Sequence, residues 1–127
     1  MITELRKRVE REVMSYRQSL AYVRGVEDGL GENTSLSETY RDRARWVWTV
    51  ERVRARLRLH EPLMEEFFAR YYALDSGAPR HTRRRGETML RVAADMNVGV
   101  STLYKWREQI LDQLVLAATQ AGVLEPY

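Results

Sequence analysis

The segment from Val100 to Lys105 places short polar, aromatic and cationic side chains in close succession. Its outward-facing members are expected to be Val100, Ser101, Thr102, Tyr104 and Lys105. Serine and threonine hydroxyls donate or accept hydrogen bonds, lysine bonds to guanine or phosphate, and valine packs on a thymine methyl group. This chemistry suits the edges of DNA bases in the major groove, so the segment is a candidate base-reading surface.

Arginines are concentrated near this candidate surface. Residues 76–108 carry seven basic and three acidic side chains, whereas residues 61–75 carry one and four. Guanidinium groups bind phosphate oxygens and position a protein on a duplex without reading its sequence. The predicted phosphate contacts are Arg80, Arg83, Arg84, Arg85, Arg91 and Arg107.

The residues that could support catalysis lack the necessary spacing. His60 and His81 have no acidic partner at the spacing of metal ligands on a helix. Glu65 and Glu66 are adjacent, so on a helix they point in different directions and do not form a convergent carboxylate pair. The glycines form no phosphate-binding loop, and the chain has no cysteine. We therefore expect a protein that is not an enzyme and that needs no metal or cofactor.

The composition predicts one soluble domain. The chain has 127 residues, of which 44% are hydrophobic and 31% charged, with a net charge of +3. No apolar run approaches the ~18 residues of a membrane span. The N-terminal MITELRKRVE has no apolar core of the kind found in secretory signals. These features favour a cytoplasmic location and argue against a membrane partner.

Proline and glycine avoid long stretches of the chain, which predicts an all-α fold. Apolar residues at spacings of three and four predict helices over residues 3–27, 37–59 and 61–74. The Gly-rich and polar residues 29–37 and the basic residues 75–87 are expected to be connections. Residues 1–60 would then form long helices for packing or oligomerisation, and residues 61–127 a helix-turn-helix domain. Phe67 and Tyr71 are expected in the core.

Four arginines share one face of the predicted helix 37–59: Arg41, Arg45, Arg52 and Arg56. They form either a solvated face that pairs with acids such as Glu38 or a surface for phosphate or a partner.

Residues 88–110 contain the elements of a helix-turn-helix. Ala93 is small enough for two helices to cross, and Asn97 tolerates the positive φ that ends a helix. Gly99 can begin the second helix. The expected inward-facing residues are Val92, Met96, Val98, Leu103 and Trp106.

The C-terminal half resembles the phage late transcriptional regulators of the RinA/ArpU type, whose DNA-binding portion is similar to region 4 of sigma-70 factors. The resemblance covers residues 57–118 and is carried by FFARYYAL (67–74) and RVAADMNVGVSTLYKWREQIL (91–111). Two features depart from the family: the connection before the second segment is longer and more basic, and Gly99 replaces a common serine. The resemblance implies an activator of phage or prophage late operons that binds double-stranded DNA in the bacterial host and contacts host RNA polymerase.

Two other functions fit the same sequence features. A small terminase-type packaging subunit also joins a helix-turn-helix to helical oligomerisation segments, and a helical protein-interaction module would use the N-terminal apolar stripe. The tail from Gln109 to Tyr127 has no lysine or arginine and keeps an apolar helical pattern. It is expected to pack against the first and second predicted helices, or alternatively to form a homodimer contact.

Overall fold

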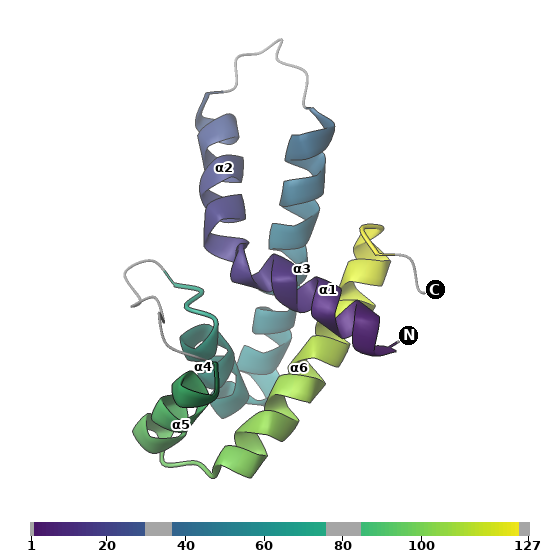
Figure 1. Cartoon of the computed structure of the whole chain (residues 1–127). Coiled ribbons are helices and arrows are strands. Elements are labelled where there is room, and N and C mark those ends of the chain that lie inside the picture. Colours follow the sequence, from purple (N-terminus) through teal and green to yellow (C-terminus); the bar gives the residue numbers. More distant parts are fainter. Residues whose placement is uncertain (1, 30–36, 76–84, 125–127) are drawn as a thin grey trace.

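The fold is all-α. The computed structural model describes residues 2–29, 37–75 and 85–124, which contain six helices and no strand. The helices are α1 (Ile2–Met14), α2 (Tyr16–Asp28), α3 (Glu38–His60), α4 (Pro62–Tyr71), α5 (Arg85–Met96) and α6 (Val100–Ala121). Figure 1 shows α2 and α3 side by side, α1 crossing near the middle of the molecule, and α4 and α5 together at the end opposite the last turn of α2 and the first turn of α3.

The predicted first helix, residues 3–27, is in fact two helices that meet at Ser15. The backbone of Ser15 has φ −98° and ψ 8°, and its N–H donates to the carbonyl of Glu12. The bend lets α1 pack against α6 while α2 packs along α3 (Figure 1). The apolar stripe runs through the break without interruption, so the sequence pattern alone predicted one helix.

The second predicted helix is confirmed as α3. The hydroxyl of Ser37 accepts a hydrogen bond from the Tyr40 N–H at 3.1 Å and so caps its first turn. Pro62 begins α4 directly afterwards, because proline fits the first turn of a helix.

α4 ends at Tyr71, three residues before the predicted end at Leu74. Ala73 adopts a left-handed conformation with φ 51°, which no helix can continue. The N–H of Leu74 then bonds to the carbonyl of Ala69 at 3.0 Å and that of Ala73 to Arg70 at 3.3 Å. This pattern is a Schellman motif, although its left-handed residue is alanine instead of the usual glycine.

One hydrophobic core joins all six helices. Phe67, Phe68 and Leu103 are fully buried, and Val9 and Val13 pack into the same cluster from α1. The prediction that the C-terminal tail packs against the first and second predicted helices is confirmed, since α6 contacts both α1 and α3. None of the helices in the described part of the chain is long and apolar enough to cross a bilayer.

Candidate nucleic-acid interface

A three-residue turn connects α5 to α6, and Asn97 forms its corner. Asn97 has φ 55°, so the prediction that it accepts a positive φ is confirmed. The N–H of Val98 bonds to the carbonyl of Ala93 at 3.0 Å, and the N–H of Asn97 to Ala94 at 3.2 Å. These two bonds form a second Schellman motif, which closes α5 and fixes the direction in which α6 starts.

Gly99 is the N-cap of α6, with φ −63° and ψ 141°. It has no side chain to accept from the first free N–H groups of α6, which leaves those donors to solvent or a ligand. The other helix of this unit, α5, begins at Arg85, three residues before the predicted start at residue 88. Arg85 therefore belongs to a helix and not to the predicted connection.

The inward faces of α5 and α6 are those predicted. Val92, Ala93 and Leu103 are buried. Met96 and Val98 are partly buried against the same core. Trp106 is also partly buried there, and its ring centroid lies 6.2 Å from that of Phe67 in a tilted arrangement. Packing therefore fixes the rotation of α6 about its axis and determines which residues it presents outward.

The outward face of α6 carries most of the predicted base-reading residues. Ser101, Thr102 and Lys105 are exposed, and Tyr104 keeps 45% of its surface exposed. Val100 differs from the prediction, because it is only partly exposed and packs against the core at the start of the helix.

The predicted phosphate-binding arginines have different positions. Arg91 is exposed on α5, on the same unit as the candidate base-reading surface. Arg80, Arg83 and Arg84 lie outside the described residues. Arg85 is the first residue of α5, and its side chain also lies outside what the structure describes.

Arg107 faces the interior of the protein and binds Glu10 of α1. Its Nε and Nη2 donate to the two carboxylate oxygens, both at 2.8 Å. The Tyr72 hydroxyl, at the end of α4, donates to Oε2 of the same carboxylate. Glu10 is only 6% exposed and the Arg107 side chain 25% exposed. These three residues, the Glu10 cluster, connect α1, α4 and α6.

Burial and charge shift the ionisation of this cluster. Burial raises the pKa of Tyr72 well above its ordinary value of 10.0, and the adjacent Glu10 carboxylate raises it further. Burial alone would lower the pKa of Arg107, but its hydrogen bonds and charge attraction to Glu10 raise it instead. The charged guanidinium of Arg107 and the neutral phenol of Tyr72 are therefore the stable forms at neutral pH.

Sequence reasoning missed Glu10 and Tyr72 as the groups that position α6. The single weak signal is that Glu10 adjoins Val9 and Val13 of the apolar stripe, where a carboxylate can be shielded from water. Its partners are 62 and 97 residues away in the sequence, and only the folded chain brings them together. Because its guanidinium is occupied, Arg107 is better suited to positioning α6 than to binding phosphate.

Within the described residues, no three histidine or acidic side chains gather closely enough to hold a metal ion. Comparison of the chain with protein families, curated proteins and solved structures found no match.

Proposed function

We propose that the protein binds double-stranded DNA through α5 and α6, acting as a helix-turn-helix, and that it regulates transcription. The observation that carries this proposal is the α5–α6 turn. The left-handed Asn97 closes α5 and allows the core to hold Leu103 while Ser101, Thr102 and Lys105 face outward. A rigid helix start with exposed hydrogen-bonding groups is what direct readout in the major groove requires.

The position of the unit supports access to a duplex. The α5–α6 turn lies at one end of the molecule, away from the last turn of α2 and the first turn of α3 (Figure 1). The first turn of α6 also has no side-chain N-cap, so its backbone N–H groups are available to a phosphate oxygen.

The charges near the candidate surface indicate where phosphate affinity must come from. Arg91 and Lys105 are exposed, but so are Asp95 and Glu108 on the same two helices. Since these charges balance, we assign most of the phosphate contacts to the arginines at positions 80, 83, 84 and 85 together with Arg91. We leave Arg107 out of this set, because Glu10 already occupies it.

The test is selection of bound duplexes from a random-sequence DNA pool, at low and near-physiological salt. Wild type is compared with Lys105→Ala and with Lys7→Ala, a matched control because Lys7 is the other lysine of the chain and is exposed on α1. We expect wild type and Lys7→Ala to enrich one motif and Lys105→Ala to lose preference at one or more positions. If Lys105→Ala weakens binding equally on every sequence, Lys105 is a phosphate contact and not a reader.

The same sample tests the two other functions. A DNA-packaging subunit would form a ring of eight or more copies in light scattering, and a protein-interaction module would have no affinity for duplex DNA. The protein-interaction module was expected to use the N-terminal apolar stripe, yet Val9 and Val13 of that stripe are covered within the single chain. This burial favours the regulator, for which an operon of phage type and a contact with RNA polymerase remain part of the proposal.

A further inference from the structure

The seven arginines of α3 fall into two groups that differ in their partners. Three of them bind acids within the protein. Arg43 lies 2.7 Å from Glu12 and 2.6 Å from Asp42. Arg54 lies 3.0 Å from Glu65 and 2.9 Å from Asp75, and Arg58 lies 3.2 Å from Glu65. These three arginines connect α3 to its neighbours, so their presence is explained by the fold.

The other four have no acidic partner among the residues that the structure describes, and all four are exposed: Arg41, Arg45, Arg52 and Arg56. On a helix of 3.6 residues per turn, their spacing of four, seven and four residues places them in one row about 22 Å long. The prediction that this row pairs with acids such as Glu38 therefore finds no support in the described residues.

An aromatic side chain lies in the middle of this row. Trp48 keeps 42% of its surface exposed, and the guanidinium of Arg52 lies 5.2 Å from its ring centroid. This cation–π contact orients both side chains on the surface. We call the four arginines and Trp48 the arginine–tryptophan strip.

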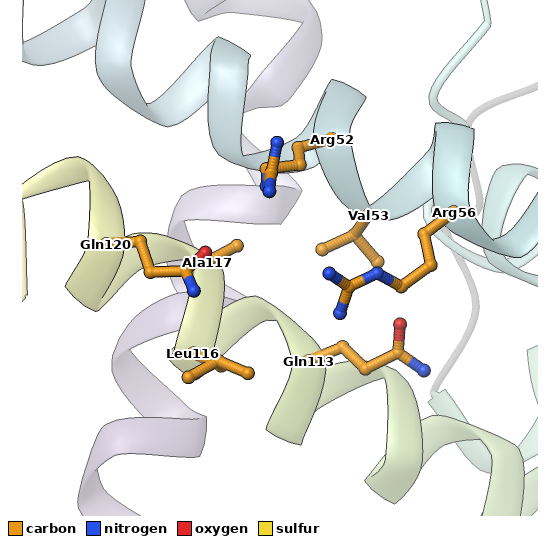
Figure 2. A pocket seen from close by; sticks show the side chains of 7 residues that line it. All are labelled: Arg52, Val53, Arg56, Gln113, Leu116, Ala117 and Gln120. Carbon is orange, nitrogen blue, oxygen red and sulfur yellow. The ribbon is translucent and has the colours of Figure 1, made fainter.

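At one end of the strip, Arg52 and Arg56 line a small groove between α3 and α6. Figure 2 shows the guanidinium groups of Arg52 and Arg56 beside this groove, with Leu116 on its opposite side. Leu116 keeps 52% of its surface exposed.

We propose that the arginine–tryptophan strip and this groove form a docking site for an acidic amphipathic helix of a protein partner. The four cations would pair with carboxylates of the partner. Trp48 and Leu116 would pack against apolar side chains that lie between those carboxylates. Tryptophan and arginine are also the residue types that dominate the binding energy of protein interfaces. A DNA backbone would use the arginines but would gain little from an exposed Trp48 and Leu116, which is why the partner is a protein.

The probe is a fluorescently labelled peptide of about 20 residues, long enough as a helix to span the strip. It carries glutamates spaced to face the four arginines and leucines between them, and a control peptide has glutamine in place of each glutamate. Binding is followed by fluorescence anisotropy with wild type, Arg52→Glu/Arg56→Glu and Trp48→Ala. Arg8→Glu/Arg11→Glu on the exposed surface of α1 is the matched charge control.

We expect the acidic peptide to bind wild type and the α1 control equally, and at least ten-fold more weakly to Arg52→Glu/Arg56→Glu. A peptide with lysine only in place of the glutamates that face Arg52 and Arg56 should regain affinity for that double variant, since both pairs of charges are then exchanged. Trp48→Ala should weaken binding several-fold without changing the salt dependence. Circular dichroism of each variant shows whether it remains folded.

Three results would overturn the proposal. Equal binding of the acidic and glutamine peptides would show that charge does not matter. Loss of duplex DNA affinity on every sequence in Arg52→Glu/Arg56→Glu, with peptide binding unchanged, would make the strip a phosphate contact. A homodimer in light scattering that Leu116→Ser dissociates would make a second copy of the chain the occupant.

Discussion

Replacing Glu10 by glutamine should lower the free energy of unfolding by about 3 kcal/mol, because the amide keeps one acceptor where the carboxylate has two. The Glu10 carboxylate accepts two hydrogen bonds from Arg107 and one from Tyr72. With glutamine, the amide NH₂ faces at least one of these donors and the charge attraction is lost. Bonds to charged groups contribute roughly 1.5–3 kcal/mol each, and an unpaired buried donor has a similar cost.

The assay is urea unfolding followed by circular dichroism, with linear extrapolation to water. For a chain of this size, the expected loss corresponds to a decrease in Tm of ~10 °C. A double-mutant cycle of Glu10→Gln and Arg107→Met should give a coupling energy of about 2 kcal/mol. Asp112→Asn is the matched control, because it breaks the Arg6–Asp112 pair, which also joins α1 to α6 at 2.7 Å but is exposed. That change should cost under about 1 kcal/mol.

A coupling energy near zero, or an equal loss for Asp112→Asn, would refute the reasoning that burial makes the Glu10 cluster strong. DNA binding gives an independent check. If Arg107 positions α6 without touching phosphate, the Arg107→Met variant should bind DNA with an unchanged salt dependence. The measurement is made at a temperature where the variant is folded. A salt slope reduced by about one would show that Arg107 does contact phosphate.

Three further changes test individual features of the fold. Ala73→Gly should raise the free energy of unfolding by about 1 kcal/mol in urea titrations, because Ala73 has φ 51° and glycine removes the strain; a decrease would contradict this. Asn97→Ala should lower it by about 1 kcal/mol, whereas Asn97→Gly should be nearly neutral, and similar losses in both would show that φ is not the cause. Burial raises the pKa of Tyr72, so the neutral phenol stabilises the fold below pH 10, and this contribution is lost as the pH rises toward the folded-state value. The stability of wild type should therefore fall more steeply above pH 10 than that of Tyr72→Phe, as measured by urea unfolding at several pH values, and parallel curves would exclude the effect.

Local patterns in the sequence were sufficient to predict much of the α5–α6 unit. Asn97 was expected at positive φ because few residues tolerate that conformation, and the structure confirms it. The inward positions of Val92 and Leu103 followed from helical spacing, and so did the exposure of Ser101 and Lys105. These features depend on residues within one or two helical turns of each other, which is the range over which sequence spacing determines neighbours.

Other features depended on contacts between distant segments, and the sequence pattern did not reveal them. The break at Ser15 exists because α1 packs on α6 while α2 packs on α3, although the apolar stripe is continuous. The sequence pattern did not distinguish Arg107 from the other predicted phosphate contacts, because Glu10 lies against it only in the folded chain.

The arginines of α3 also show which features follow from helical spacing and which depend on the tertiary structure. Helical spacing by itself determined that Arg41, Arg45, Arg52 and Arg56 share one face. Only the tertiary structure decided that Arg43, Arg54 and Arg58 have acidic partners while this row has none among the described residues. The physical reason is that a charge's partner is set by what packs beside it in space, and helical periodicity carries no information about elements far away in the chain.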